Sequence, residues 1–341
     1  MRSMAPDHEY HLLEVVEVVD ETADTKSFVL EIPPELDETF TYTAGQYCTF
    51  RATIDGESVV RSYSMSSAPE TGDPFTTTVK RVPEGRMSNW MNDTVGAGTA
   101  IEVMRPAGRF VLRDRATPIV AFAGGSGITP VLSVIKAALV ATARPIQLVY
   151  ANRSADAVIF RDALERLRST SDGRLSVHHH LDDERGYLDA AQCHAFASEH
   201  PDADVYVCGP GAYMDVVEAG LATTGIAADQ VFIERFTTPD AGPVPTDDPV
   251  PDSIVIRLDQ RKHTLAYRAT DTVLETARRG GLGPPFSCEA GNCATCMAHL
   301  DRGTVRMRVN NALTSEELDD GWVLTCQSIP TSDDVVVNYD A

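Results

Sequence analysis

Four cysteines near the end of the chain place the strongest constraint on what this sequence can fold into. Cys288, Cys293 and Cys296 stand on one short segment and Cys326 follows later, with four, two and 29 residues between them. Three thiolates on one segment can surround a soft metal centre only if the backbone wraps tightly around it, and Gly291 gives the freedom for such wrapping. We therefore expect the C-terminal segment to fold around a metal centre.

This cysteine spacing is typical of the plant-type [2Fe–2S] ligand set. Zinc is an alternative, but zinc sites usually pair two short cysteine knuckles, whereas Cys326 has no second cysteine close to it in sequence. Four unrelated buried thiols are the remaining alternative. Apolar residues beside the cysteines, such as Phe286 and Leu324, suit the shell of a cluster. Residues 252–341 as a whole resemble a plant-type ferredoxin domain, which implies an α+β fold of the β-grasp type.

The composition excludes several classes of protein. Against 29 lysines and arginines stand 50 aspartates and glutamates, and the resulting net charge of −21 repels nucleic acid. The sequence holds no run of about 18 apolar residues, so we expect no membrane span. The first ten residues lack the apolar core of a secretory signal, which predicts a cytoplasmic protein with reduced cysteines.

Changes in residue pattern divide the chain into three folded segments and a linker. Residues 8–114 hold short β-rich runs broken by turn residues, which predicts an antiparallel β-barrel. Residues 115–238 alternate apolar strands with helices, which predicts a doubly wound parallel sheet. Residues 239–251 are rich in proline and aspartate and predict a linker, before the ferredoxin-like segment 252–341.

The expected elements follow from these patterns. The expected strands are residues 12–19, 26–32, 47–54, 75–82, 118–123, 146–150, 204–207 and 231–233, and a hairpin joins 254–258 to 263–267. The expected helices are residues 130–141, 156–167, 212–222 and 272–279, the last of them capped by Asp271.

A glycine-rich turn joins an apolar strand to a helix in the second segment. It carries Gly124, Gly125 and Gly127, followed by Thr129 and Pro130 at the start of the helix. Glycines let a pyrophosphate approach the backbone, and the amides at a helix N-terminus attract its charge. A turn without a ligand is the alternative interpretation.

A second junction of the same kind carries Cys208, Gly209 and Pro210. Two such turns at the carboxyl ends of parallel strands mark a binding crevice. For Cys208 the alternative is a small buried residue without a role in binding.

The first segment holds two short groups suited to another nucleotide. The first group is Arg61, Ser62, Tyr63 and Ser64, in which an arginine can neutralise a phosphate and a tyrosine can stack on an aromatic ring. The second group, Gly85, Arg86, Met87 and Ser88, leads into a helix whose amides can bind a pyrophosphate.

Taken in chain order, these motifs resemble the ferredoxin-NADP reductase superfamily. With the ferredoxin-like segment, the whole chain resembles the three-domain reductases of multicomponent oxygenases, in particular those serving 3-ketosteroid 9α-hydroxylases and phenylacetyl-CoA epoxidases. The resemblance implies that FAD binds to the barrel, NADH or NADPH to the parallel sheet, and a [2Fe–2S] cluster to the four cysteines.

The resemblance also implies residue roles. Tyr63 would stack on the flavin and Ser64 would lie near its N5 atom, with Arg61 on the phosphates. Val79, Lys80 and Arg81 would line the ribityl–phosphate path, and residues 85–88 would hold the pyrophosphate. Thr129 and Cys208 would lie near the nicotinamide, with Glu234 and Phe236 closing the site, and Ser64, Cys208 and Glu234 are the implied catalytic residues.

The implied activity is transfer of electrons from NAD(P)H through FAD and the cluster to a terminal oxygenase, most naturally a Rieske-type ring or steroid hydroxylase. A reductase for a di-iron monooxygenase or a fatty-acyl desaturase is the alternative, followed by a stand-alone redox sensor. A flavin diaphorase with a zinc-bound tail is a further alternative. We expect a monomer.

Three other features leave their role open. Arg153 and Arg161 follow the second strand of the sheet, where an arginine accepts the 2′-phosphate of NADPH; the resemblance to the steroid-type reductases nevertheless favours NADH. His178, His179 and His180 are consecutive in an expected strand and so cannot converge on one metal, which predicts a solvated strand. Residues 316–320 are acidic and form either a docking site for a basic partner or a solvated helix face.

Overall fold

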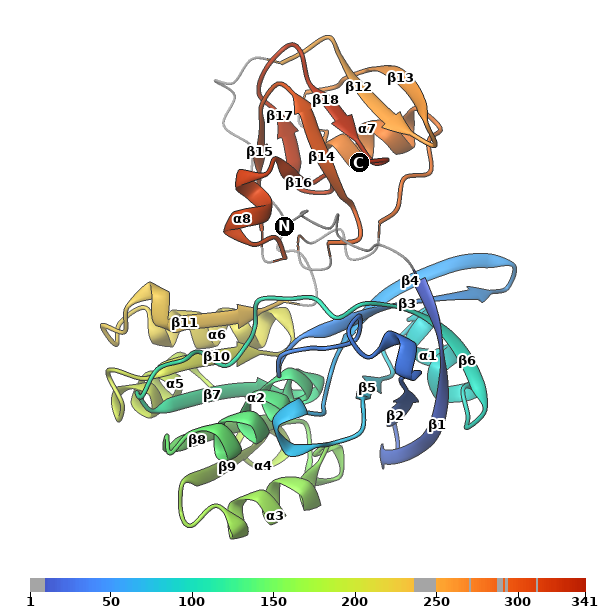
Figure 1. The fold of residues 1–341 in the computed structure, drawn as a ribbon. Helices are drawn as coiled ribbons and strands as arrows, with labels where there is room; N and C mark the ends of the chain where they lie inside the picture. Colours follow the sequence, from blue (N-terminus) through green and yellow to red (C-terminus); the bar gives the residue numbers. More distant parts are fainter. Residues whose placement is uncertain (1–9, 236–249, 270, 287–290, 292–293, 311) are drawn as a thin grey trace. The chain divides into compact units, whose positions relative to one another are not determined.

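The computed structural model describes residues 10–235, 250–269, 271–286, 291, 294–310 and 312–341. The chain divides into two compact units, one of residues 10–236 and one of residues 237–341 together with residues 1–9, and each is described by itself (Figure 1). The predicted linker, residues 239–251, lies almost wholly outside the described residues, as do Phe236, Cys288 and Cys293.

The first part of the larger unit is a six-stranded antiparallel sheet that curls into a near-closed barrel. Its strands, in the order β4-β3-β6-β1-β2-β5, are β1 (Tyr10–Thr22), β2 (Thr25–Glu31), β3 (Tyr47–Ile54), β4 (Glu57–Ser64), β5 (Thr76–Lys80) and β6 (Thr99–Met104). The two edge strands approach each other where the bridge between Met65 and Thr77 forms and Thr77 Oγ1 donates to the carbonyl of Ser64 at 2.9 Å. Helix α1 (Arg86–Thr94) packs Met87 and Met91 into the barrel core.

The second part of this unit is a five-stranded parallel sheet. Its strands, in the order β11-β10-β7-β8-β9, are β7 (Ile119–Gly124), β8 (Ile146–Asn152), β9 (Leu175–Leu181), β10 (Asp204–Cys208) and β11 (Val231–Glu234). The connecting helices are α2 (Ile128–Ala141), α3 (Arg161–Thr170), α4 (Asp182–Arg185), α5 (Ala190–Ser198) and α6 (Gly211–Leu221).

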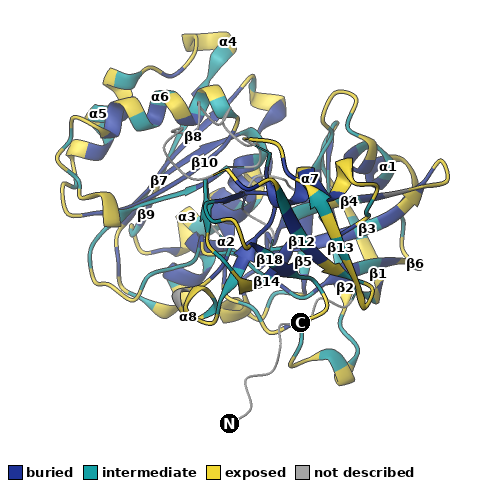
Figure 2. Ribbon diagram, turned by 90° about the horizontal axis from the view of Figure 1, so that it is seen from above, coloured by how far each residue is buried: buried dark blue, intermediate teal, exposed yellow. Residues whose placement is uncertain are grey.

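Strand β7 shows why the sheet is buried on both faces. Ile119, Ala121 and Ala123 pack into one hydrophobic core, whereas Val120 and Phe122 pack into the core on the opposite face. A continuous apolar run of this kind is what a central parallel strand requires. In Figure 2 β7 and β10 are buried, whereas the short helix α4 is mostly exposed. The chain reverses its direction of travel across the sheet between β7 and β10, which is the position where such sheets bind ligands.

The smaller unit combines a five-stranded mixed sheet with a two-stranded one. The larger sheet has the order β13-β12-β18-β14-β16 and contains β12 (Ser253–Leu258), β13 (Arg261–Ala266), β14 (Met297–Arg302), β16 (Trp322–Leu324) and β18 (Val336–Asn338). Strands β15 (Val305–Met307) and β17 (Ser328–Pro330) form the second sheet, and the helices are α7 (Val273–Arg279) and α8 (Ser315–Asp319). The parallel pairing of β12 with β18 brings the two ends of the segment together beneath α7.

The expected elements agree with the structure apart from some boundaries. The strand at residues 47–54 is confirmed as β3, whereas the helix expected at residues 156–167 begins only at Arg161. Phe160, the residue before that helix, adopts a φ of +59°, a left-handed conformation that interrupts the helical path. The prediction that Asp271 caps α7 is also wrong. Thr272 is the cap, since its Oγ1 accepts a hydrogen bond from the backbone N–H of Glu275, and Asp271 pairs with Arg279.

Among the described helices, none combines the length and the apolar character that crossing a bilayer requires. The domain boundaries given above from the sequence remain predictions.

Candidate functional site

The two glycine turns meet at the carboxyl edge of the parallel sheet. A Cβ atom built on Gly127 would lie 2.1 Å from the carbonyl oxygen of Cys208, and one on Gly124 would lie 2.9 Å from the ring of Tyr213. Glycine is therefore required for the turn after β7 to pack against the turn after β10. Thr129 is buried just behind, where its Oγ1 donates to the carbonyl of Ser126 at 2.9 Å.

Helix α2 begins at this junction without a side-chain cap. The N–H of Ile128, its first residue, donates to the carbonyls of Gly125 and Ser126 in the preceding 3₁₀ turn (Gly125–Gly127), so an anion at this junction would meet the amides of that turn. Pro130 occupies the first turn of α2, as expected, since a proline has no amide to satisfy there.

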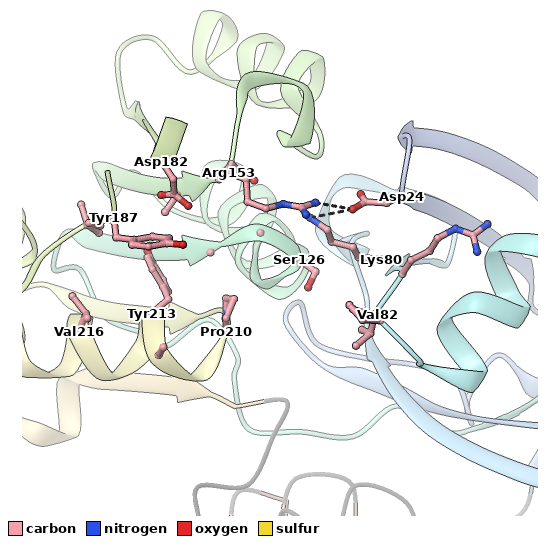
Figure 3. Close-up of a pocket in the computed structure, with 18 of the residues that line it drawn as sticks. Asp24, Lys80, Val82, Ser126, Arg153, Asp182, Tyr187, Pro210, Tyr213 and Val216 are labelled. Carbon is pink, nitrogen blue, oxygen red and sulfur yellow. Dashed lines mark hydrogen bonds and ion pairs between the residues drawn. The ribbon is translucent and has the colours of Figure 1, made fainter. Parts of the chain in front are cut away.

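A cavity of about 830 Å³ opens beside the glycine turns, between the barrel and the parallel sheet of the larger unit (Figure 3). Its volume lies in the range of about 300–1,000 Å³ that is common for small-ligand sites. Gly124, Gly125, Arg153 and Pro210 line it from the sheet side, and Lys80 and Arg81 from the barrel side. The sequence motifs for two nucleotides thus contribute to one pocket.

Four residues with ionisable side chains are among the residues of this cavity that went unrecognised in the sequence. Asp24 lies on the turn between β1 and β2, Asp182 and Tyr187 follow β9, and Tyr213 lies in α6. The side chain of Tyr187 is 87% exposed, which leaves an aromatic face open to a ligand at the rim. Tyr213 Oη is buried and has no hydrogen-bond partner among the described residues, as expected for a polar atom that a ligand would satisfy.

Asp182 could have been found in the sequence. It directly follows the strand that contains the three histidines, and the acid that binds a ribose in such folds stands at a strand end. Only the end of the second strand was considered for this role, where Arg153 stands and no acid is present, and the end of the third strand was therefore missed. Burial raises the pKa of Asp182, with a further contribution from Asp183.

A buried carboxyl group links the barrel to the sheet. Ser64 Oγ, at the end of β4, donates to Glu234 Oε2, at the end of β11, over 3.0 Å. Cys208 is the partner of Glu234 in the parallel register of β10 and β11, and it is fully buried. The structure therefore brings together the three residues that the resemblance implied as catalytic, from positions up to 170 residues apart.

The electrostatics of this group differ from those of an ordinary carboxylate. Burial raises the pKa of Glu234 to about 8, although the hydrogen bond from Ser64 partly offsets the effect. Burial and then the charge of Glu234 raise the pKa of Cys208, which keeps the thiol protonated. A carboxyl group that titrates near neutral pH can hold or release a proton during turnover.

The barrel residues expected to hold a flavin fall into two sets. Ser62 Oγ and Thr49 Oγ1 lie 2.9 Å apart, Tyr63 is tilted against Phe50, and Arg61 is exposed with one N–H donating to the carbonyl of Val60 at 2.7 Å. Arg61 is thus exposed, whereas Ser62 and Tyr63 are partly buried.

The second set lies around the start of α1. Gly85 precedes the helix, and a Cβ atom there would lie 2.5 Å from Ser88 Oγ and 3.0 Å from the carbonyl oxygen of Val82, so a larger residue would crowd the turn. The side chains of Val79 and Met87 belong to the barrel core, so contacts from these residues to a cofactor would use the backbone. α1 has no side-chain cap, so its first turn suits the phosphates of a flavin nucleotide. The aromatic ring of Tyr63 suits the flavin ring.

Two arginines of this region are already engaged within the barrel. Arg86 pairs with Glu57 at 2.5 Å and donates to the carbonyl of Ile54 at 2.8 Å. Arg81 pairs with Asp93 at 2.5 Å. Part of the positive charge that either guanidinium could offer to a phosphate is therefore already neutralised within the barrel.

Cys296 and Cys326 lie together in the smaller unit. Both are buried, and the backbone N–H of Cys326 points at Cys296 Sγ over 3.5 Å. Gln327 Nε2 lies 3.6 Å from Cys326 Sγ, a second N–H donor toward a sulfur. Gly291 has a φ of +76°, and a Cβ atom there would lie 2.7 Å from the carbonyl of Val309, so this position requires a glycine.

Two sulfurs with N–H donors in a buried setting fit a thiolate-bound cluster. In the described residues no three metal-ligating side chains converge, because Cys288 and Cys293 lie outside them. The predicted ligation by all four cysteines therefore stays a prediction at the level of individual residues.

The three histidines of β9 contact three different neighbours. His178 packs on Phe196 with ring centroids 4.7 Å apart, His179 lies 5.9 Å from the ring of Tyr150, and His180 Nε2 lies 2.8 Å from the carbonyl of Gly186. The prediction of a solvated strand is wrong for His180, which is buried, because the turn after α4 folds back over it.

Models of three protein families match the chain. An oxidoreductase FAD-binding domain matches residues 12–112, an oxidoreductase NAD-binding domain residues 122–219, and a 2Fe-2S iron-sulfur cluster binding domain residues 256–331. These matches cover the barrel, the parallel sheet and the smaller unit in that order.

Two characterised relatives match over almost their full length. The ferredoxin reductase component of 3-ketosteroid-9-alpha-monooxygenase from Mycobacterium tuberculosis (strain CDC 1551 / Oshkosh) is 38% identical over 96% of this chain and 95% of its own. A component of 1,2-phenylacetyl-CoA epoxidase from Escherichia coli (strain K12) is 32% identical over 97% of this chain and 98% of its own.

A solved structure with the same domain content agrees. Phthalate dioxygenase reductase, described as a modular structure for electron transfer from pyridine nucleotides to [2Fe-2S], superimposes with a TM-score of 0.60 at 26% identity, over 96% of this chain and 98% of its own. The predicted fold classes and the three cofactors FAD, NAD(H) and [2Fe–2S] are confirmed by these matches. The chain belongs to the family of oxidoreductases that serve as reductase components of multicomponent oxygenases.

Proposed function

We propose that this reductase takes electrons from NADH and passes them, through FAD and the [2Fe–2S] cluster, to a terminal oxygenase of the Rieske type that hydroxylates a ring or steroid substrate. The observation that carries the proposal is the full-length similarity to the reductase component of a 3-ketosteroid-9-alpha-monooxygenase, at 38% identity. FAD, when bound, accepts a two-electron hydride and releases electrons singly, as a [2Fe–2S] centre requires.

The residues of the cavity support NADH as the donor. Lys80 and the amides of the turn at Gly125 would bind the pyrophosphate, and Tyr187 offers a face for the adenine. Asp182 would accept hydrogen bonds from the ribose hydroxyls and repel a 2′-phosphate. Arg153, the candidate for a 2′-phosphate, already pairs with Asp24 at 3.0 Å.

The remaining role assignments follow the geometry of the barrel and the sheet. Arg61, Tyr63 and the start of α1 would hold the flavin, and Phe236 would lie beside it. Ser64, Glu234 and Cys208 would position the nicotinamide, with the Ser64–Glu234 pair holding a proton at the carboxyl oxygen. Gly127, Thr129 and Gly209 shape the turns rather than line the cavity.

An anaerobic titration with NADH tests the proposal. We expect the flavin and cluster absorption bands of the wild type to bleach together. The purified protein should contain iron and acid-labile sulfide in equal amounts. The variant Cys326→Ser should retain NADH-dependent reduction of ferricyanide, which accepts electrons from the flavin, and should lose reduction of cytochrome c. Zinc in place of iron, or unchanged cytochrome c reduction in the variant, would refute the proposed electron path.

A reductase for a di-iron enzyme is the second candidate, favoured by the 32% identity to the component of a phenylacetyl-CoA epoxidase. Reconstitution separates the two. The purified reductase is mixed with a Rieske oxygenase component or with a di-iron component, and product formation per NADH consumed is compared. Coupled turnover with the di-iron component alone would replace the first candidate by the second.

A further inference from the structure

Asp24 places a negative charge inside the cavity described above, between two positive ones. Its Oδ2 atom lies 3.0 Å from an Arg153 nitrogen and 3.8 Å from Lys80 Nζ (Figure 3). Its Oδ1 atom accepts hydrogen bonds from Thr22 Oγ1 at 2.9 Å and Thr25 Oγ1 at 3.1 Å. The carboxylate is thus held in place by the β1–β2 turn on one side and by two cations on the other.

The two cations lie where a phosphate would bind. Lys80 Nζ is 3.9 Å from a Cβ atom built on Gly125, so the ammonium group sits over the glycine turn that precedes α2. Arg153 directly follows β8 at the same edge of the sheet. An anion in this position meets two positive side chains and the uncapped 3₁₀ turn Gly125–Gly127, which is the environment of a bound pyrophosphate.

Asp24 also compensates the burial of Lys80. Burial lowers the pKa of Lys80, and the charge of Asp24 acts in the opposite direction. Burial raises the pKa of Asp24, but the hydrogen bonds from the two threonines and the charges of Lys80 and Arg153 outweigh this effect and lower it overall. Asp24 is therefore ionised at neutral pH.

We propose that Asp24 is a resident counter-ion of the nucleotide pocket, which competes with the phosphates of the dinucleotide for Lys80 and Arg153 and so limits affinity, most strongly for the more highly charged NADPH. The inference rests on the proposed binding of NAD(P)H in this cavity. Asp24 belongs to none of the motifs that mark the site, and its effect requires only that it and a phosphate cannot both neutralise the same two cations.

The chain offers a matched control for removal of the Asp24 charge. Asp73 pairs with Lys136 of α2 at 2.7 Å and, like the pair of Asp24 with Arg153, joins the barrel segment to the sheet segment. The side chains of Asp24 and Asp73 are both 32% exposed, and Lys80 and Lys136 are 17% and 20% exposed. Asp73 does not line the cavity. Asp73→Asn therefore reports the loss of an ion pair of the same kind without a change in the pocket.

Calorimetric titration of the FAD-loaded, cluster-loaded protein tests the proposal. The ligands are ADP-ribose, 2′-phospho-ADP-ribose and adenosine, which carry a pyrophosphate, a pyrophosphate with a further phosphate, and no phosphate. In Asp24→Asn we expect ADP-ribose to bind about three- to fivefold tighter, as the loss of one competing, partly exposed ion pair predicts. The gain should be larger for 2′-phospho-ADP-ribose and absent for adenosine, and Asp73→Asn should match the wild type.

Two results would overturn the role of Asp24. Unchanged or weaker binding of ADP-ribose to Asp24→Asn would overturn the proposal, and so would an equal gain for adenosine, because that gain would reflect a wider pocket rather than released cations. Adding Arg153→Gln to Asp24→Asn should remove part of the gain. If wild-type protein bound neither phosphorylated ligand, the proposed nucleotide site itself would fall, whereas failure of Asp24→Asn alone would leave that site intact.

Discussion

Replacing Glu234 by glutamine should change how the stability of the protein depends on pH. The carboxyl group is buried, and its pKa is raised from an ordinary 4.5 to about 8. The folded protein therefore binds this proton more tightly than the unfolded chain does. The contribution of Glu234 to the free energy of unfolding is largest below pH 4.5 and falls as the pH rises toward 8, because the folded state opposes ionisation of this group.

The size of the effect follows from the two pKa values. Over the whole interval the loss is about 5 kcal/mol, since each tenfold change in proton affinity corresponds to about 1.4 kcal/mol. About 2.5 kcal/mol of it falls between roughly pH 5 and 7. Glutamine has the same shape, can accept the hydrogen bond from Ser64 through its carbonyl oxygen, and does not ionise. The Glu234→Gln variant should therefore exceed the stability of the wild type by about 0.8 kcal/mol at pH 5 and by about 3.3 kcal/mol at pH 7.

Urea unfolding at pH 3, 4, 5, 6, 7 and 8, followed by the rise in flavin fluorescence on release, measures this difference. Glu102 provides a control of opposite sign, because its hydrogen bond with Arg51 lowers the pKa of this half-exposed carboxylate. Glu102→Gln should lose stability relative to the wild type above pH 4.5, and the loss should shrink as the pH falls through the lowered pKa. A constant offset between Glu234→Gln and the wild type at every pH would refute the reasoning.

Four further predictions concern the cofactors and the partner. Arg153→Ala should leave kcat with NADH little changed at saturating NADH, because the proposed role of Arg153 is at the phosphates and not at the nicotinamide, whereas NADH affinity should fall; selective loss of NADPH activity, from a wild type that prefers NADPH, would contradict the assignment to NADH. Asp182→Asn should raise kcat/KM for NADPH relative to NADH by about tenfold, consistent with removal of one like charge near a 2′-phosphate, and an unchanged ratio would exclude Asp182 as the discriminating acid. Cys326→Ser should abolish the visible and EPR signals of the cluster while FAD content stays constant, and an intact EPR signal would remove Cys326 from the ligand set. Raising the salt concentration should slow electron transfer to the protein partner more than transfer to a small artificial acceptor, if the acidic residues 316–320 dock a basic surface; equal slowing of both reactions would contradict electrostatic docking.

Much of the fold could be predicted because its signals are local. The continuous apolar run of β7 predicts a buried parallel strand without knowledge of its neighbours, and β3 has the predicted bounds. The prediction failed where a backbone conformation intervened: α3 starts late because Phe160 adopts a left-handed φ that an amphipathic pattern does not reveal. The prediction for His180 failed because a turn six residues away covers it.

The sequence by itself determined which chemistry the chain can carry. Cysteine spacing and glycine turns are short-range patterns, because a cluster loop or a phosphate turn must be built from consecutive residues. Only the tertiary structure decided which charges meet in the cavity. Asp24 and Arg153 are 129 residues apart and Ser64 and Glu234 are 170 residues apart, and no sequence period reports such pairs. They form because the barrel meets the carboxyl edge of the parallel sheet: Asp24 and Arg153 both line the cavity, whereas Ser64 and Glu234 meet at a buried contact outside its lining, where burial gives Glu234 a proton affinity that its residue type alone does not have.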